Sequence, residues 1–408
     1  MICRHCRAEL TLNFVDLGSA PPSNAYLSAV DLRAPEVWYP LRVLVCERCW
    51  LVQTEDHAGR EALFAGDYAY FSSFSSSWLR HAEQYVESMA SRFALDGSSR
   101  VVEVASNDGY LLQFVKERGI PCLGIEPTAG TAAAARDKGI DVLGEFFGVA
   151  LADRLASQGY SADLITANNV LAHVPDINDF VSGFARLLKS QGVATFEFPH
   201  LLRLVESCQF DTVYHEHFSY LSFTAIEKIF EKNGLTVFDV QELPTHGGSL
   251  RVFAERCDSR SRAPTPAVAS VRSAEAEVGV SSAGYYAGFQ ARAERVKDDL
   301  VAFLIDAKRS GKRVVGYGAA AKGNTLLNFA GVRADLVSWV VDRNPAKQDR
   351  YLPGSRIPVV AEEFLQTHRP DYVLVLPWNL KAEISEQLNY VGRWGGRLVT
   401  AVPCLEVA

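Results

Sequence analysis

The sequence predicts an α/β protein with a small N-terminal metal-binding domain and two larger domains in which strands alternate with helices. Two Cys-x-x-Cys pairs lie within the first 49 residues, and apolar segments alternate with helical patterns over 100–200. A similar alternation returns after residue 312. Such alternation is typical of a parallel sheet covered by helices. At 408 residues the chain is also too long for a single hydrophobic core.

The cysteine pairs are Cys3–Cys6 and Cys46–Cys49, and 39 residues separate them. Each Cys-x-x-Cys turn aims two thiolates at one point, so the two pairs predict a tetrahedral four-cysteine zinc site. Since four sulfur ligands leave no open position, we expect this zinc to be structural. The alternative is four unrelated reduced cysteines. Between the pairs, residues 37–45 are expected to form a strand.

The remaining elements follow from hydrophobic periodicity and from turn residues. We expect strands at 100–105, 121–125, 164–166, 194–198, 236–241, 250–255, 313–317, 336–342, 372–376 and 397–402. Helices are expected at 129–138, 176–189, 225–233 and, in part, 268–309, with another starting at 325–330. The polar, proline-bearing segment 256–270 is the expected linker between domains.

A ligand site is expected where the first of these strands ends, because open α/β sheets bind ligands at the carboxyl ends of their strands. Gly109 would let the backbone approach a ligand closely, and Glu126 could accept both hydroxyls of a ribose. The turn lacks the Gly-x-Gly-x-x-Gly pattern, which favours the adenosyl group of S-adenosylmethionine over NAD. A turn without a ligand is the alternative. The candidate cofactor-binding residues are Glu103, Ser106, Asn107, Gly109, Glu126, Pro127, Asn168 and Asn169.

The run 214–220 (Tyr-His-Glu-His-Phe-Ser-Tyr) is the most informative segment of the chain. Six of its seven residues can move a proton or donate a hydrogen bond, and such residues are costly to desolvate without partners. This density suits acid/base chemistry. A polar surface loop is the alternative. His173, after a further strand, would lie beside a methyl donor or be a structural histidine, and the hydroxyl-rich segment 67–74 contributes Tyr68 and Tyr70.

Two glycine-containing turns are candidates for substrate binding. Small residues surround Lys322 in 316–324 and form a candidate anion site, although the spacing is not that of a Walker A loop. His246 precedes two glycines in a turn that could face between domains. An ordinary turn is the alternative in both cases. The candidate substrate-binding residues are Tyr70, His246, Lys322 and Asn324.

In their order along nearly the whole chain, these features resemble the sugar C-methyltransferases of antibiotic biosynthesis, which methylate carbon on nucleotide-linked 4-keto-deoxysugars. Besides the four cysteines, the resemblance rests on 103–109, 169–174, 214–217 and 318–324. It implies a zinc-binding domain (1–60), a Rossmann-like class I methyltransferase domain (61–257) and a C-terminal Rossmann-like α/β domain (258–408). The substrate, with dTDP as its nucleotide and C3 favoured over C5, would lie between the last two domains.

The resemblance also implies that His217 is the general base and that Tyr214, Glu216, His173 and Tyr68 line the reacting sugar. The chemistry agrees, because a carbon next to a ketone must lose a proton before it can attack a methyl group. Glu216 would orient His217 or bind substrate, and Tyr214, Tyr68 and His173 are candidate donors to the enolate oxygen.

Other functions remain open at this point: O- or N-methylation on the same fold, an NAD-dependent sugar-modifying enzyme, and a non-enzymatic zinc-binding scaffold. A net charge of −7 gives no reason to expect nucleic acid or a membrane as a partner. With neither an evident signal sequence nor a membrane span, we expect a cytoplasmic enzyme. The sequence does not decide the oligomeric state, and a monomer is compatible with it.

Overall fold

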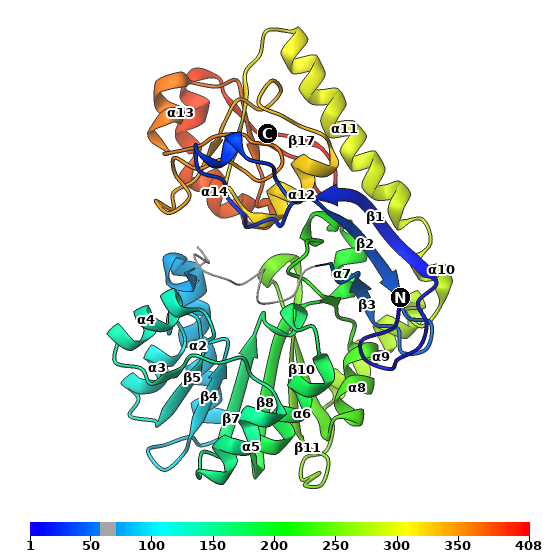
Figure 1. The fold of residues 1–408 in the computed structure, drawn as a ribbon, viewed down its shortest axis with the longest axis vertical. Helices are drawn as coiled ribbons and strands as arrows, with labels where there is room; N and C mark the ends of the chain where they lie inside the picture. The colour runs from blue at the N-terminus through cyan, green and yellow to red at the C-terminus, as the bar shows by residue number, and fades with distance from the viewer. Residues whose placement is uncertain (58–70) are drawn as a thin grey trace.

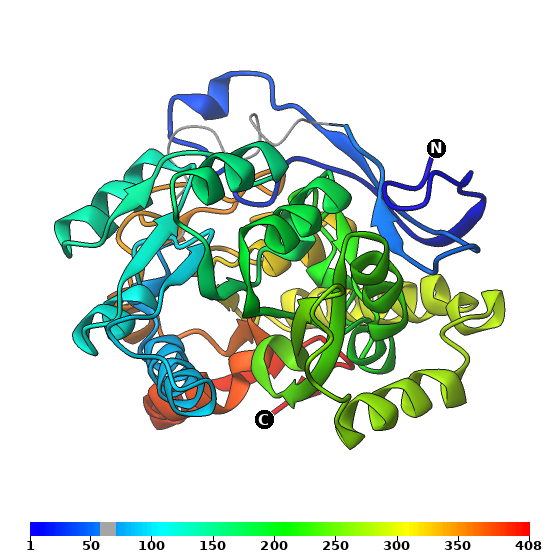
Figure 2. The ribbon, with the colours of Figure 1, turned by 90° about the horizontal axis from the view of Figure 1, so that it is seen from below.

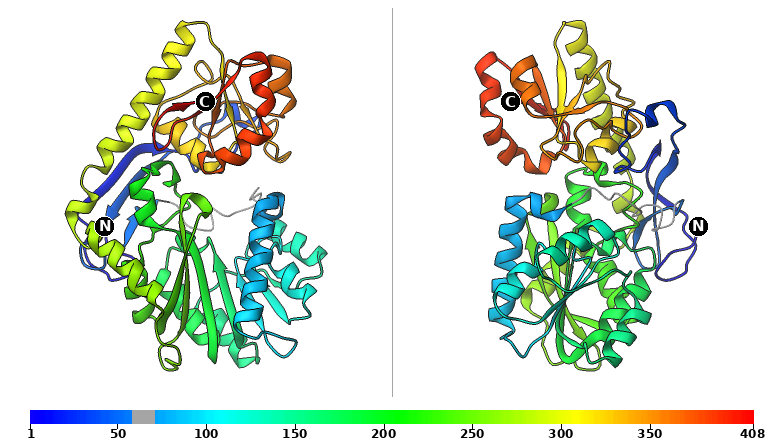
Figure 3. Two further views of the ribbon diagram at one scale, coloured as in Figure 1. Left: turned by 180° about the vertical axis from the view of Figure 1, so that it is seen from behind. Right: turned by 60° about the vertical axis from the view of Figure 1, so that its left-hand side comes forward.

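A computed structural model of the protein describes residues 1–57 and 71–408. Its strands form three sheets, one for each part of the molecule (Figure 1). The two larger sheets belong to two α/β bodies, and the N-terminal strands lie along one side of both (Figure 3). The two termini lie on opposite sides of the view in Figure 2. No helix in the described part of the chain is long and apolar enough to span a bilayer.

The N-terminal sheet is antiparallel in the order β1-β2-β3-β9. Its strands are β1 (Leu12–Ala20), β2 (Tyr39–Val45), β3 (Val52–Thr54) and β9 (Ser219–Tyr220), and a short 3₁₀ helix, η1 (Asp31–Arg33), follows β1. The fourth strand therefore comes from a distant part of the chain, directly after His217. This pairing attaches the metal-binding part to the segment that the sequence marked for acid/base chemistry.

The central sheet has the order β10-β11-β8-β7-β4-β5-β6, in which β11 alone runs antiparallel to its neighbours. Its strands are β4 (Val101–Val104), β5 (Cys122–Ile125), β6 (Val142–Leu143), β7 (Ala162–Asn168), β8 (Leu188–Pro199), β10 (Leu235–Leu243) and β11 (Ser249–Arg256). The chain order reverses between β4 and β7, and such a switch point is where open α/β sheets bind ligands.

Helices cover both faces of this sheet (Figure 1). They are α2 (Ser76–Arg92), α3 (Leu112–Glu117), α4 (Ala129–Asp137), α5 (Val149–Ser157), α6 (Ile177–Leu187), α7 (Leu201–Glu206) and α8 (Phe223–Lys232). Four 3₁₀ turns lie between them: η2 (Ser72–Phe74), η3 (Leu171–His173), η4 (Phe210–Thr212) and η5 (Thr245–Gly247). The start of α6 shows the local logic, because the Asp176 carboxylate accepts hydrogen bonds from the first helical amides.

The C-terminal sheet has the order β14-β13-β12-β15-β16-β17. Its strands are β12 (Val314–Tyr317), β13 (Val340–Val341), β14 (Val359–Val360), β15 (Tyr372–Val375), β16 (Arg397–Thr400) and β17 (Glu406–Val407). The helical elements of this half are α10 (Ala283–Tyr286), α11 (Phe289–Arg309), α12 (Ala321–Phe329), α13 (Glu363–His368), η6 (Trp378–Leu380), α14 (Lys381–Gln387) and η7 (Asn389–Trp394). The preceding helix, α9 (Pro266–Val278), packs against β10 and α8 of the central body. The strand order of the C-terminal sheet is the Rossmann order, with its switch point between β12 and β15.

Three expectations about elements were wrong in part. The helix expected to start at 325 begins at Ala321, so Lys322 lies in its first turn. The strand expected at 336–342 is reduced to Val340–Val341, because a turn joins Leu336 to Arg333. The segment 256–270 is ordered rather than a free linker. The Glu255 carboxylate accepts hydrogen bonds from the backbone amide and the guanidinium of Arg262, and α9 already begins at Pro266.

The core joins the three parts into one body. One apolar cluster contains Cys3 and Cys46 together with residues of the central sheet and α6, while another joins β1 and β2 to α11 and the C-terminal sheet. Phe14 of β1 stacks on Phe289 of α11, with ring centroids 4.3 Å apart. The N-terminal part is therefore a shared support for both α/β bodies (Figure 3).

Candidate active site

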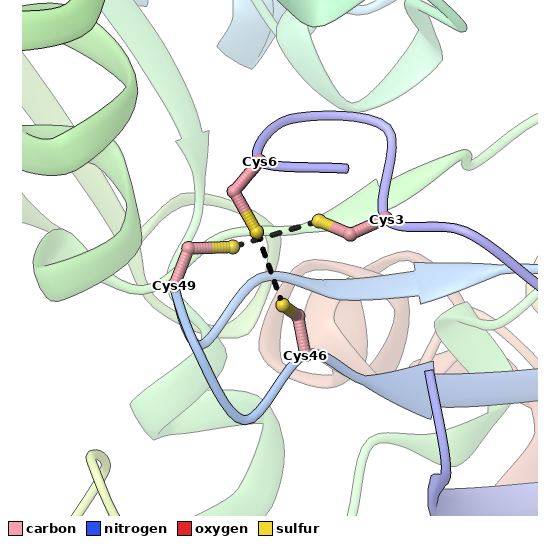
Figure 4. A group of neighbouring side chains, drawn as sticks. All are labelled: Cys3, Cys6, Cys46 and Cys49. Carbon is pink, nitrogen blue, oxygen red and sulfur yellow. Dashed lines mark hydrogen bonds between the residues drawn. The ribbon is translucent and has the colours of Figure 1, made fainter. Parts of the chain in front are cut away.

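The four predicted metal ligands converge at one point (Figure 4). Their sulfur atoms all lie within 4.8 Å of one another, with 3.6 Å between Cys3 and Cys49 and 3.4 Å between Cys6 and Cys46. Sulfurs around a tetrahedral zinc with bonds of about 2.3 Å would be about 3.8 Å apart. The cluster therefore fits zinc without rearrangement of the chain.

The two cysteine turns share one backbone conformation. The amide of Arg7 donates to the Cys3 carbonyl at 3.1 Å, and that of Trp50 donates to the Cys46 carbonyl at 2.7 Å. Arg7 and Trp50 both have left-handed backbones, with φ of 63° and 66°. The nearby His5 bonds Asn178 at 2.8 Å through Nδ1, so its ring is engaged outside the sulfur cluster. All four ligand positions belong to cysteine, as expected for a structural site.

At the cofactor edge, Glu126 ends β5 and holds the loop that follows β4. Its Oε2 accepts from the Asn107 amide at 3.0 Å, and its Oε1 accepts from the Thr128 amide at 2.9 Å. The Asn107 side chain in turn accepts a hydrogen bond from the Ser72 amide at 2.9 Å. Both the backbone amide and the side chain of Asn107 are therefore hydrogen-bonded within the protein. The half-buried Pro127 follows Glu126.

The space beside Gly109 is occupied by the protein itself. A Cβ atom at this position would lie 2.4 Å from Cδ1 of Ile140 and 3.3 Å from Cβ of Ala135, and the backbone φ is +75°. Helix packing and the left-handed turn therefore each require glycine here, and the expected close approach of this backbone to a ligand stays a prediction.

Two of the buried polar atoms at this edge, Oγ of Ser106 and Oδ1 of Asn169, have no hydrogen-bond partner among the described residues. Glu103 is fully buried beside them, with the Tyr110 hydroxyl as a hydrogen-bonding neighbour. Burial raises the pKa of Glu103 well above its usual value, and the nearby charges of Glu126 and Asp108 add to this. Asn168 is also buried and accepts from Thr166 at 3.3 Å. Acceptors left unpaired here suit S-adenosylmethionine, which carries an ammonium, two ribose hydroxyls and a sulfonium.

His217 has a defined tautomer. Its Nδ1 lies 2.9 Å from the carbonyl oxygen of Thr212, which can only accept, so Nδ1 carries the proton and a neutral ring keeps its lone pair on Nε2. Burial lowers the pKa of His217 well below its usual value, and the nearby imidazole of His173 lowers it further. The ring centroid of His217 lies 3.9 Å from that of Tyr214 and 4.6 Å from that of His173. The structure thus brings together a neutral imidazole and two neighbouring side chains that can donate hydrogen bonds.

Glu216 does not orient His217, which corrects one of its two expected roles. Thr212 holds the imidazole instead, and Oε1 of Glu216 accepts from the amide and the side chain of Asn24 at 3.3 and 3.2 Å. Burial raises the pKa of Glu216. Its Oε2 has no hydrogen-bond partner in the part of the chain that the structure describes. The role of a substrate ligand stays a prediction.

The metal-binding part fixes the loop that carries His217. Thr54, which ends β3, donates its hydroxyl to the His217 carbonyl at 2.9 Å, and its amide donates to the Phe218 carbonyl at 3.2 Å. One residue earlier, Gln53 accepts from the Arg4 amide at 2.9 Å and donates to Sγ of Cys3 at 3.3 Å. A chain of contacts therefore runs from the sulfur cluster to the proposed base.

The C-terminal body brings Lys322 to this region. Its Nζ donates to Asn379 at 2.6 Å and lies 4.8 Å from the ring centroid of Trp378, whose Nε1 donates to Asp211 at 2.7 Å. Burial lowers the pKa of Lys322, and Asp211 partly offsets this effect. Asn324, by contrast, is buried and donates to the Ser23 carbonyl at 2.7 Å, which ties the N-terminal segment to α12.

The other predicted site residues divide into two groups. His246 lies in η5 and pairs with Asn169 across 3.2 Å, so it belongs to the same region as the base. Burial lowers the pKa of both His246 and His173 to about 4. Tyr68 and Tyr70 fall outside the described residues, and their roles stay predictions.

Sequence reasoning missed the residues that connect these groups. They are Asn24, His81, Glu197, Asp211, Arg251, Trp378 and Asn379. Glu197 lies near the end of β8 at the ligand-binding edge of the sheet, and that position was the signal that could have identified it. The others have partners 54 to 192 positions away along the chain, so no local sequence pattern identifies them.

Three family models match successive parts of the chain. Residues 3–64 match a putative zinc binding domain, residues 78–240 a methyltransferase domain, and residues 244–403 a C-methyltransferase C-terminal domain. Among solved structures, the PH0226 protein from Pyrococcus horikoshii OT3 aligns with a TM-score of 0.38 and 13% identity over 49% of this chain and 100% of that chain.

Two curated relatives differ in how much of the chain they match. Ubiquinone biosynthesis O-methyltransferase from Bartonella quintana (strain Toulouse) is 24% identical over 34% of this chain and 61% of its own length. C-methyltransferase NovU from Streptomyces niveus is 34% identical over 98% of this chain and 95% of its own length. The chain, with its zinc-binding, methyltransferase and C-terminal domains, belongs to the family of S-adenosylmethionine-dependent C-methyltransferases.

Proposed function

We propose that the enzyme methylates a carbon next to the ketone of a nucleotide-linked 4-keto-deoxysugar, with dTDP as the nucleotide and C3 favoured over C5. The observation that carries this proposal is His217, whose Nδ1–H is held by the Thr212 carbonyl and whose Nε2 is left as a base. An acidic C–H beside a ketone is the group that such a base can deprotonate.

The reaction follows from this arrangement. His217 takes the proton, the C–H electron pair becomes the carbon–carbon double bond, and the carbonyl π electrons move to oxygen as an enolate. Tyr214 and His173, beside the base, are candidate donors to that oxygen. Bound S-adenosylmethionine supplies an electrophilic methyl group, so that a carbon–carbon bond forms as the methyl–sulfur bond breaks.

Lys322 supports a nucleotide sugar as substrate. Its side chain is half-buried, and its charge influences the pKa of both His217 and Asp211, so it lies near both groups. A half-buried cation without a salt bridge among the described residues suits a phosphate group, and Trp378 and Asn379 fix its position. The ketone and the diphosphate of one substrate would then engage the two α/β bodies together.

The first test is incubation with carbon-13-methyl S-adenosylmethionine and a set of dTDP-4-keto-6-deoxysugars in deuterated water, followed by carbon NMR. We expect a new methyl signal coupled to a ring carbon, at a position that identifies C3 or C5. A methyl group on oxygen or nitrogen would contradict the proposed chemistry. No transfer to any of these sugars would contradict the substrate class.

His217→Asn tests the base. The asparagine amide can still donate to Thr212, but it offers no basic nitrogen, so we expect methyl transfer to fall at least about 100-fold while cofactor affinity stays within about twofold. His215→Gln is the matched control, because Nε2 of His215 donates to the Tyr39 and Pro40 carbonyls at 3.3 and 3.2 Å. Near-normal turnover by His217→Asn would show that another group removes the proton.

A further inference from the structure

The turn after β10 holds a strained histidine. His246 has φ of 54° and ψ of 22°, a left-handed conformation that a histidine adopts only at some cost. Gly247 and Gly248 follow, with φ of 88° and 114°. Because β10 runs parallel to β8, this turn lies at the same sheet edge as Asn169 and the cofactor residues. Strain of this kind persists where the surroundings over-determine it, and it concentrates at functional sites.

Hydrogen bonds fix the turn on every side. The Thr245 carbonyl accepts from the Gly248 amide and from Oγ of Ser249, both at 2.9 Å. The Gly247 carbonyl accepts from Nε2 of Gln209 at 2.8 Å, and the Gly248 carbonyl accepts from the His200 amide at 3.0 Å. The position of the His246 ring is therefore set before any ligand binds.

A second left-handed residue faces the first. Asn169 has φ of 55°, and its Nδ2 lies 3.2 Å from Nε2 of His246. An amide nitrogen can only donate, so Nε2 accepts and the proton of the neutral ring lies on Nδ1. Nδ1–H has no hydrogen-bond partner among the described residues, and the residue is half-buried. His246 is thus an uncharged donor with its proton free for a ligand.

Glu197 holds both strained residues at once. Its backbone carbonyl accepts from the Asn169 amide at 2.7 Å, and its carboxylate accepts from Oγ1 of Thr245 at 3.2 Å. Arg251 and His81 bind the same carboxylate at 2.8 and 2.9 Å, which compensates a charge that is fully buried. Burying a carboxylate with these partners costs free energy. The structural effect of the network is to hold Asn169 and His246 in fixed positions.

The location of the pair indicates its ligand. Asn169 directly follows β7 at the switch point of the methyl-donor sheet, and His246 lies near enough to His217 to influence the charge of that base. Gly247, next to His246, lies against Trp378 of the C-terminal body. The donor is therefore near the base, the methyl donor and the second body together. In the proposed substrate, the carbonyl oxygen is one bond from the carbon that bears the transferred proton.

We propose that His246 is a further catalytic residue, which donates its Nδ1–H to the ketone oxygen as negative charge develops there, and that Asn169 sets the tautomer required for this. The inference rests on the proposed function. His217 keeps the abstracted proton, the oxygen gains the carbonyl π electrons, and the proton of His246 stays on nitrogen as a hydrogen bond. A neutral imidazole is suited to this role, because it can donate Nδ1–H as a hydrogen bond to the developing oxyanion without giving up the proton.

The test follows enolate formation separately from methyl transfer, by exchange of the proton beside the ketone for deuterium without cofactor. His246→Asn keeps a donor near Nδ1 and tolerates the left-handed backbone, so we expect exchange within about tenfold of the wild type. His246→Gly also tolerates the backbone but removes the donor, and we expect a loss of about 100- to 1,000-fold. Thermal unfolding and cofactor affinity should change little in either variant.

The tautomer provides a readout that does not depend on activity. Nitrogen-15 NMR of the labelled enzyme should show His246 as the Nδ1–H form, and Asn169→Gly should lower both the fraction of this form and the exchange rate. The Nε2–H tautomer in the wild type, or exchange by His246→Gly at the wild-type rate, would overturn the role of His246 alone. A wild-type enzyme that neither exchanges nor methylates any keto sugar would overturn the proposed function and this inference with it.

Discussion

Each imidazole of the site is held in its neutral form. Burial is the main cause of the lowered pKa values, which are about 4 for His173 and His246, and His217 is also shifted well below its usual value. At neutral pH these rings act as uncharged acceptors and donors. A diphosphate bound near Lys322 would favour the protonated form of His217 and so strengthen it as a base during the reaction.

Asp211 is an acidic residue of the site that no sequence pattern identifies. It is fully buried in η4, its Oδ2 accepts from Trp378, and its Oδ1 has no hydrogen-bond partner in the described ranges. Burial raises the pKa of Asp211 to about 6, against the opposing effects of Lys322 and Trp378. This carboxyl group is therefore protonated in part of the pH range in which free aspartate is ionised.

Asp211→Asn removes this titration and keeps an acceptor for Trp378. Between the ordinary value of 3.8 and about 6, the folded wild type holds a proton that the unfolded chain has released. The wild type therefore loses stability as pH rises through this window. We expect the unfolding free energy of the variant relative to the wild type to increase by about 3 kcal/mol from about pH 4 to 7. Urea unfolding at several pH values measures it, and a difference independent of pH would contradict the raised pKa.

The residues that could be predicted are those whose signal is local. The spacing of the four cysteines predicts a tetrahedral metal site, and the polar run containing His217 stands out because so many of its residues can move protons or donate hydrogen bonds. Glu216 was expected either to orient His217 or to bind substrate, whereas the Thr212 carbonyl is the group that holds Nδ1 of His217. Every residue carries a backbone carbonyl, so the sequence does not show which one will accept from His217. The pairing of His246 with Asn169 is equally hard to predict, because the two residues lie in loops 77 positions apart.

Among the elements, β3 links the metal site to the chemistry. It pairs with β9 through Val52–Tyr220 and Gln53–Ser219, so the register of two short strands sets where the loop before β9 lies. Thr54 then fixes His217 itself through its carbonyl. Because β3 begins only three residues after Cys49, loss of the metal should disturb the position of His217.

Cys46→Ser tests this link. We expect the variant to lose bound zinc, to unfold at lower temperature and to show a kcat at least about tenfold lower, because the strand that positions His217 loses its anchor. Cofactor affinity should change little, since Glu126 and Asn168 belong to the central sheet. Cys404→Ser, at an exposed cysteine, is the matched control. Metal analysis, thermal unfolding and kinetics measure these effects, and a zinc-free variant with normal kcat would contradict the link.

The longest strand in the described part of the chain that the sequence did not predict is β1. Its register against β2 shifts twice, between Asn13 and Val15 and between Asp16 and Ser19, so inward and outward residues do not alternate. Without that period of two, a strand has no sequence signature of its own. The longer strands of the α/β bodies were predictable because they are buried apolar runs separated by helices. The two-residue edge strands β6, β14 and β17 are too short to show such a pattern.

At the scale of the whole molecule, two sheets with switch points face one shared region. Lys322 and Trp378 come from the carboxyl edge of the C-terminal sheet, and Asp211 and Gly247 meet them from the central body. The alternation of strands and helices in the sequence predicts both sheets but not their relative orientation. The contacts that set this orientation join residues more than 100 positions apart. The N-terminal sheet, packed against both bodies, holds them in this arrangement.

Lys322→Gln tests whether the two bodies share one substrate. A charge-assisted hydrogen bond to phosphate contributes about 1.5–3 kcal/mol, so we expect the KM for the nucleotide sugar to rise at least about tenfold. Inhibition by free dTDP should weaken by a similar factor. Since the charge of Lys322 lowers the pKa of His217, the acid limb of the pH–rate profile should also move to higher pH.

Cofactor affinity should stay within about twofold in this variant, because the cofactor edge belongs to the other body. Lys308→Gln is the matched control: this lysine is exposed and its Nζ contacts Asp335 at 2.8 Å, and it lies before the start of β12, at the opposite edge of the sheet from the switch point. An unchanged KM with an unchanged response to dTDP would mean that the diphosphate does not reach the C-terminal body. The nucleotide would then have to bind within the central domain, and the half-buried lysine would serve only to support Trp378 and Asn379.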